Sequence, residues 1–110
     1  MTEPDRIFKA LSDPARVKIL EFLRSPSAGC CVFDDRICAC DVERILGVSQ
    51  ATVSHHMKLL IDAGLVTAAK HGRWTMYRVN AAAFSRLGEW LAPFGACAPG
   101  GACSPRAVNA

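Results

Sequence analysis

The stretch from Val48 to Val66 constrains the fold most, because it predicts one capped helix with two different sides. Ser49 is a good N-cap, since its hydroxyl can accept a hydrogen bond from a free amide of the first turn. Gly64 is a good stop signal, since glycine adopts the left-handed conformation without strain. Three apolar residues at helical spacing indicate the side that faces a core: Val53, Met57 and Leu60.

The first two turns of this helix carry short amide, hydroxyl and imidazole groups. Such groups suit base edges and phosphates in a DNA major groove, although a solvated helix face is polar as well. His55 and His56 point about 100° apart on a helix, so we do not expect them to form one metal site. Both are candidates for DNA contact, or, in the case of His56, for partial packing against the protein. The candidate DNA contacts are Ser49, Gln50, Thr52, Ser54, His55, His56 and Lys58.

The flanking segments predict a mainly α fold with a small β-hairpin wing, a winged helix-turn-helix. A shorter helix, expected over Asp41–Leu46, ends at Gly47 directly before the Ser49 helix, and two helices joined by a tight glycine-containing turn form a helix-turn-helix. Two β-like runs, Leu65–Lys70 and Arg73–Val79, follow it and are joined by His71-Gly72. The charges at the hairpin tip are candidates for contacts to the DNA backbone, or else solvated turn charges: Lys70, His71 and Arg73.

The outer segments predict three more helices. One runs from Pro4 to about Leu11, and a second begins at Pro14 with an apolar stripe, while its Arg16 and Lys18 are expected to be solvated. Residues 1–94 form the predicted domain, and residues 95–110 form a Gly/Pro/Cys-containing tail that we expect to be flexible. The last helix, from residue 81 to about 94, carries a stripe that suggests a dimer seam packed with the first helix: Phe84, Leu87, Leu91 and Phe94.

Cysteines supply the most informative chemistry. The chain of 110 residues has six cysteines, and no export signal is expected, so we interpret them as reduced cytosolic thiols for metal binding or redox work. An Asp34-Asp35 hairpin turn would place Cys31 opposite Cys38, and in extended chain Cys38 and Cys40 point to the same side. We therefore predict a thiolate site on Cys31, Cys38 and Cys40, with Cys30 as the alternative third ligand. This hypothesis needs a non-helical segment up to Cys40, with the helix beginning near Asp41.

Several of these motifs resemble one family. Cys38-Ala39-Cys40-Asp41-Val42, then Leu46-Gly47-Val48-Ser49-Gln50-Ala51-Thr52-Val53-Ser54-His55-His56-Met57-Lys58-Leu59-Leu60, then Ala63-Gly64-Leu65-Val66 and Gly72-Arg73-Trp74-Thr75-Met76-Tyr77-Arg78 resemble the ArsR/SmtB family of metal- and metalloid-responsive repressors. The resemblance covers roughly Asp5 to Phe94. It implies a homodimeric repressor of double-stranded operator DNA, with As(III) or Sb(III) as the leading inducer class.

The sequence departs from the family pattern at three places. Many arsenic-responsive relatives carry a third cysteine one turn after the Cys-x-Cys pair, and here Glu43 stands in that region. The cysteine arm of cadmium- and lead-type relatives is absent, and so are the Asp and His ligands that zinc-type relatives carry on the last helix. Cd, Pb or Hg nevertheless remain alternative inducers, since thiolates select soft ions.

Two-fold symmetry predicts an inverted-repeat operator. Ion binding would pull the cysteine hairpin onto the Asp41 helix and so disturb the recognition helix, and a coupling of about 1–3 kcal/mol would change DNA affinity by about 5–150-fold. The sequence leaves three roles open for Cys97 and Cys103 in the tail: they form a second thiol site, they reach the first site, or they are exposed thiols.

Other functions are less consistent with the sequence. A net charge of +3 is only mildly basic, so the argument for DNA rests on local residues. No apolar run approaches the ~20 residues of a membrane span, and we expect a cytoplasmic protein with no organic cofactor and no enzymatic activity. A thiol reductase would need Cys-x-x-Cys in a βαβ context, and the ordered core pattern argues against a metal-storage protein. A redox sensor with a disulfide between Cys30 or Cys31 and Cys38 or Cys40 remains the main alternative.

Overall fold

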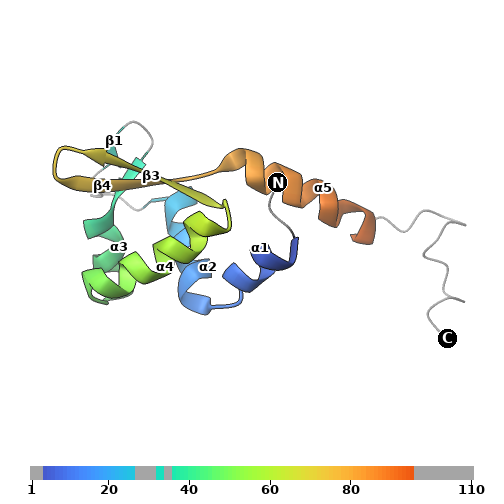
Figure 1. Ribbon diagram of the computed structural model, residues 1–110, viewed down its shortest axis with the longest axis horizontal. Helices are drawn as coiled ribbons and strands as arrows, with labels where there is room; N and C mark the ends of the chain where they lie inside the picture. The colour runs from blue at the N-terminus through green and yellow to red at the C-terminus, as the bar shows by residue number, and fades with distance from the viewer. Residues whose placement is uncertain (1–3, 27–31, 34–35, 96–110) are drawn as a thin grey trace, which may run out of the picture.

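A computed structural model describes residues 4–26, 32–33 and 36–95 of the chain and confirms the winged helix-turn-helix (Figure 1). The described elements follow in the order α1 (Pro4–Ala10), α2 (Pro14–Arg24), β1 (Val32–Phe33), β2 (Arg36–Cys38), α3 (Ala39–Leu46), α4 (Gln50–Asp62), β3 (Val66–His71), β4 (Trp74–Val79) and α5 (Ala81–Gly95). Helices α3 and α4 form the helix-turn-helix, and β3 with β4 forms the wing above them. No described helix is long and apolar enough to span a bilayer.

Helix α4 has the caps and the buried side that its sequence predicts. The Ser49 hydroxyl accepts a hydrogen bond from the Thr52 amide at 3.2 Å, and Gly64 has a φ of +80° just after the helix. Val53, Met57 and Leu60 are at most 1% exposed, and they pack into one core with residues of α2, α3 and the sheet. The other side of α4 is thereby left at the surface, with its orientation fixed by the buried stripe.

The sheet is more extensive than a simple wing. Its strand order is β1-β2-β4-β3, so the cysteine-bearing strand β2 pairs antiparallel with β4. Because β4 lies between β2 and β3 and is also packed against helices, Met76 and Tyr77 are both buried although they point to opposite faces. Both faces of β4 are therefore covered near the middle of the strand.

The wing turn lies one residue later than the sequence suggested. His71 pairs with Trp74, so the two turn residues are Gly72 and Arg73, and not His71 and Gly72. Gly72 has a φ of +63°, which the first central residue of a two-residue hairpin turn requires. The shift places Arg73 at the tip of the wing.

Arg16 on α2 is buried, contrary to the expectation that it is solvated. Its Nε donates to the Ala10 carbonyl at the end of α1 at 2.6 Å, and its Nη1 lies 3.2 Å from His56 Nδ1 on α4. Asp13, the N-cap of α2, adds an ion pair at 3.6 Å. The core side of α2 runs through Arg16, Ile19, Leu20 and Leu23, so the apolar side chain of Val17 is turned outward and is 39% exposed.

Replacing Arg16 should destabilise the fold more than an ordinary helix substitution. Arg16→Met would keep much of the buried stem but leave the Ala10 carbonyl and the His56 ring without their donor. We expect the free energy of unfolding to fall by about 1–3 kcal/mol, measured by urea denaturation. Lys18→Met on the exposed side of the same helix is the control and should change stability by less than about 0.5 kcal/mol. Equal losses for the two variants would contradict a structural role for Arg16.

Candidate nucleic-acid interface and thiol site

The start of α4 presents its polar groups to solvent. Gln50, Ser54, His55 and Lys58 are exposed, and Thr52 is partly exposed. The Ser49 hydroxyl is occupied by the cap and lies 3.1 Å from the Thr52 hydroxyl, so these two side chains support each other at the helix start. Lys58 forms a surface ion pair with Asp62 at 3.7 Å. The side chains singled out from the sequence, apart from His56, therefore share one open face.

His56 lies toward the protein interior. It is half-buried, and since an arginine can only donate hydrogen bonds, its Nδ1 accepts from Arg16. The sequence left open whether His56 faces DNA or packs partly against the protein, and this geometry fits the second interpretation. His56 connects the recognition helix to α2.

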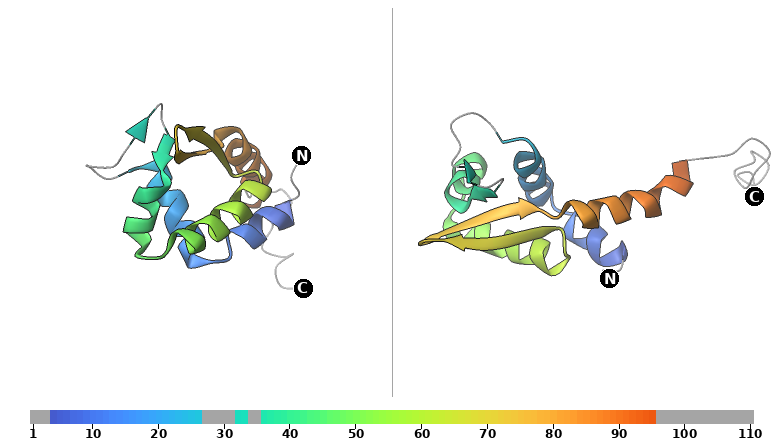
Figure 2. Two further views of the ribbon diagram at one scale, coloured as in Figure 1. Left: turned by 60° about the vertical axis from the view of Figure 1, so that its left-hand side comes forward. Right: turned by 90° about the horizontal axis from the view of Figure 1, so that it is seen from above.

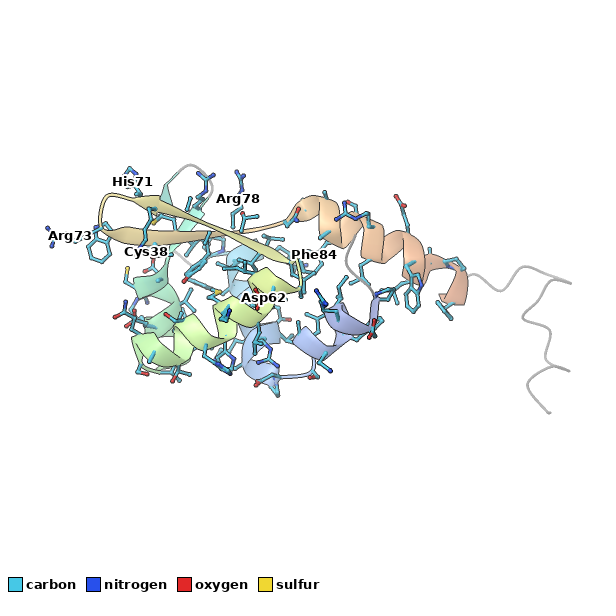
Figure 3. All side chains as sticks on the ribbon, viewed as in Figure 1. Cys38, Asp62, His71, Arg73, Arg78 and Phe84 are labelled. Carbon is cyan, nitrogen blue, oxygen red and sulfur yellow. The ribbon has the colours of Figure 1, made fainter. Side chains whose placement is uncertain are left out.

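The wing carries basic side chains at its far end. Lys70, His71 and Arg73 are all exposed, and Figure 3 shows His71 and Arg73 at the tip of the hairpin. Lys70 Nζ donates to the Thr75 hydroxyl across the two strands at 3.1 Å. Trp74, which the sequence analysis did not single out, is 53% exposed beside them. Its position directly after the turn was the signal that could have identified it.

Cys38 and Cys40 lie together at the start of α3. Their sulfur atoms are 2.7 Å apart, and the Cys38 sulfur also accepts a hydrogen bond from the Cys40 amide at 3.3 Å. Cys38 is only 3% exposed, whereas Cys40 is partly exposed. The two sulfurs are therefore in contact, and among the described residues Cys40 is the more accessible member of the pair.

The helix begins earlier than the chelation argument required. It starts at Ala39 and not near Asp41, so Cys40 lies in its first turn. The two sulfurs nevertheless meet because Cys38 is the N-cap, with an extended backbone (φ −66°, ψ 141°) that turns its side chain back over the first turn. A pair made of the N-cap and the second helical residue thus replaces the expected extended Cys-x-Cys segment.

The described strands agree with the predicted cysteine hairpin as far as they extend. Val32 pairs with Ile37 and Phe33 with Arg36, which is the predicted register. The proposed ligands Cys31 and Cys30 lie outside the described residues, and so do Cys97 and Cys103. Within residues 4–26, 32–33 and 36–95, no three His, Cys, Asp or Glu side chains gather as a metal site. The described part of the thiol site is the pair Cys38 and Cys40.

Cys38 also connects the thiol pair to the wing. In the sheet it is paired with Met76 of β4, while in sequence it directly precedes α3 (Figure 3). Next to the pair, the buried carboxylate of Asp41 forms an ion pair with Arg44 at 3.2 Å. This ion pair holds the first turn of α3. A ligand that moves Cys38 would therefore act on both the wing and the helix-turn-helix.

A small pocket lies beside Cys40, among candidate DNA contacts at the start of α4 and on the wing. Its volume is about 230 Å³. Its walls come from the starts of α3 and α4 and from the wing, which overhangs them in Figure 2. The lining residues are Ala39, Cys40, Glu43, Gln50, Lys70, Arg73, Trp74 and Thr75.

The single tyrosine of the chain, Tyr77, reports on the surroundings of Cys38. Burial raises the pKa of the Tyr77 phenol above its ordinary value of 10.0, and the negative charge of the Cys38 sulfur raises it further. Because the fold favours the neutral phenol, its contribution to stability is complete below pH 10 and is lost as the pH rises from 10 through the folded-state pKa.

A tyrosinate absorbance titration should therefore give a higher midpoint for the folded protein than for the protein in denaturant. The denatured chain should titrate near the ordinary value. Cys38→Ser should lower the folded midpoint part of the way, because it removes the second cause and leaves burial. A folded midpoint at or below that of the denatured chain would contradict this description of the Tyr77 environment.

Comparisons with known proteins give consistent results. Residues 13–68 match the family model described as bacterial regulatory protein, arsR family. An arsenical resistance operon repressor from Staphylococcus xylosus is 45% identical over 78 residues, which are 71% of this chain and 66% of that protein. A cadmium resistance regulatory protein homologue from Staphylococcus aureus is 37% identical over 75 residues, which are 68% of this chain and 55% of that protein.

A solved structure shows the same architecture. An ArsR-like transcriptional regulator from Rhodococcus superposes with a TM-score of 0.66 at 29% identity, covering 84% of this chain and 78% of that one. The alignments span 66% of the length of the first staphylococcal relative and 55% of the second, so the chain matches about half to two thirds of these proteins.

Proposed function

The chain belongs to the arsR family of bacterial regulatory proteins, and on that premise we propose that it is a homodimeric repressor that releases operator DNA when a thiophilic ion binds Cys38 and Cys40. The observation that carries the proposal is the sulfur pair, 2.7 Å apart, at the N-cap of the first helix of the helix-turn-helix. A repressor of this kind acts in the cytoplasm, where its operator lies, and regulates transcription without catalysing a reaction.

The DNA-binding half of the proposal rests on the exposed face of α4. Short polar side chains at the start of a helix reach base edges in the major groove, while the cations of the wing lie against the sugar-phosphate backbone. Ser49 and His56 act in this scheme mainly by positioning α4, through the cap and through Arg16. The proposed contact residues are Gln50, Thr52, Ser54, His55 and Lys58 on α4 and Lys70, His71 and Arg73 on the wing.

The homodimer rests on apolar side chains that α1 and α5 leave at the surface. The rings of Phe8 and Trp90 are tilted against each other at a centroid distance of 5.6 Å, and the Trp90 ring in turn lies 4.9 Å from that of Phe94. These three residues and Leu91 are between 41% and 69% exposed. Helix α5 extends away from the helix-turn-helix in Figures 1 and 2, so its outer end is available to a second copy.

The inducer is proposed from the chemistry of the sulfurs. Arsenite binds by exchange without redox change: each new As–S bond joins a cysteine sulfur to arsenic, and the thiol proton leaves with an arsenic hydroxide as water. Trivalent arsenic and antimony prefer three bonds, and we assign the third ligand to Cys31, with Cys30 as the alternative. A cadmium regulator among the similar proteins keeps Cd, with Pb and Hg, as an alternative inducer.

The test is fluorescence-anisotropy binding to DNA from the promoter of the chain's own gene, under reducing conditions. Arsenite, antimonite, cadmium, lead, zinc and mercury would be titrated in parallel. Selective release by arsenite or antimonite is the expected result. Release by an oxidant and by none of these ions would replace the proposal with a disulfide-based redox sensor. The absence of any specific DNA binding would overturn the DNA-binding function itself.

A further inference from the structure

The 230 Å³ pocket brings inducer ligands and DNA contacts onto the same walls. Cys40 and Glu43 reach it from α3, and Gln50 reaches it from the first turn of α4. Lys70 and Arg73 close it from the wing, so one small space is shared by a proposed ion ligand and three proposed DNA-contacting residues. Nothing in the proposed function requires these two groups to be adjacent.

An ion on the sulfur pair must lie at this pocket. The bond from a cysteine sulfur to a metal is about 2.3 Å long, so an ion bound to both sulfurs stays close to Cys40. Cys38 is 3% exposed and lies against the sheet, whereas Cys40 is partly exposed and lines the pocket. Among the described residues, the open approach to the pair is therefore from the pocket side.

The same pocket suits a phosphate of the DNA backbone. It is lined by two cationic side chains, Lys70 and Arg73, which attract a phosphate, and by Gln50, the first residue of α4, whose side-chain amide can donate a hydrogen bond to one. Lys70 is held over the pocket by its hydrogen bond to Thr75, another lining residue. The carboxylate of Glu43 on the opposite wall balances part of the positive charge when no phosphate is bound.

We infer that the inducer ion and one operator phosphate exclude each other from this pocket, so that induction is competitive at this position. The inference rests on the proposed function and specifies how its two halves are coupled. It differs from a purely conformational coupling, in which ion and DNA bind together with reduced affinity. In a competitive mechanism the complex of protein, DNA and ion does not form.

The two mechanisms give different titration curves. The operator Kd would be measured by anisotropy over several decades of free arsenite, with a phosphine reductant in place of thiols. Competition predicts that the apparent Kd rises in proportion to free arsenite until it reaches the value for unrelated DNA. Conformational coupling predicts a plateau after an increase of about 5–150-fold. A plateau below the Kd for unrelated DNA would overturn the inference but leave the proposed function intact, whereas no release by any ion would contradict the proposed function.

A second measurement tests the shared space directly. In a variant that keeps only Cys38 and Cys40 (Cys30→Ser, Cys31→Ser, Cys97→Ser, Cys103→Ser), saturating operator DNA should slow alkylation of Cys40 by iodoacetamide by about tenfold or more. The matched control adds Ser85→Cys, an exposed position on α5 away from the pocket, whose alkylation rate should not change with DNA. An unchanged rate at Cys40 in the DNA complex would also overturn the inference.

Discussion

Replacing Cys38 and Cys40 together by serine should abolish the response to arsenite and leave operator binding intact. A serine hydroxyl is a poor ligand for a soft ion, so two of the three proposed ligands are lost. The start of α3 should survive, because Cys38 is the N-cap and serine is itself one of the strongest N-cap residues. In the anisotropy assay the double variant should bind the operator with the wild-type Kd and retain it at arsenite concentrations that fully release the wild type.

The matched control for this variant is Cys97→Ser with Cys103→Ser, which also removes two thiols. It should respond as the wild type does if the tail cysteines are not ligands. Single Cys31→Ser and Cys30→Ser variants then identify the third ligand as the one whose loss weakens the response. Normal release of DNA from the Cys38/Cys40 double variant would show that the sulfur pair is not the inducer site.

The features that could be predicted from sequence are those set by neighbouring residues. The cap at Ser49, the buried stripe of α4 and the stop at Gly64 depend on contacts within one or two turns. The pairing of Val32 with Ile37 was likewise predictable, because a two-residue turn fixes the register of its strands. These local signals were sufficient to place α3, α4 and the wing in order.

Features that depend on distant contacts could not be predicted in the same way. The burial of Arg16 depends on an acceptor at the end of α1 and on His56, forty positions away in the sequence. The pairing of β2 with β4, which makes Cys38 part of the wing sheet, has no signal in a three-residue strand. The pocket is formed by three separate segments, so it depends on how they pack together in the fold.

The helix start at Ala39 separates the contact of the two sulfurs, which the sequence predicts, from the backbone conformation, which it predicts wrongly. The condition that Cys38 and Cys40 meet at one ion predicts a helix that begins only near Asp41. An N-cap residue has non-helical backbone angles next to a helical segment, so the pair meets with only Cys38 outside the helix. The capping role of a cysteine is less obvious in sequence than that of serine or aspartate.

Introducing charges at the outer end of α5 should convert the protein into a folded monomer with weak operator binding. Leu91 is 42% exposed and Phe94 is 69% exposed, so Leu91→Glu with Phe94→Glu would place two carboxylates on this apolar surface. Across a two-fold axis the same charges would meet each other, so the dimer should dissociate. Two linked half-site contacts typically gain about 10²–10⁴-fold over one, and operator affinity should fall by that factor. Sedimentation velocity and anisotropy measure the two effects.

Ala82→Glu with Ser85→Glu is the matched control, because it adds the same charge to exposed positions on another side of α5. It should remain dimeric and bind the operator nearly as the wild type does. Circular dichroism of both variants should be unchanged, since neither pair of positions belongs to the buried core. A wild-type protein that sediments as a monomer while binding an inverted repeat tightly would contradict the role given to α5. In that case the apolar end of the helix would need another explanation.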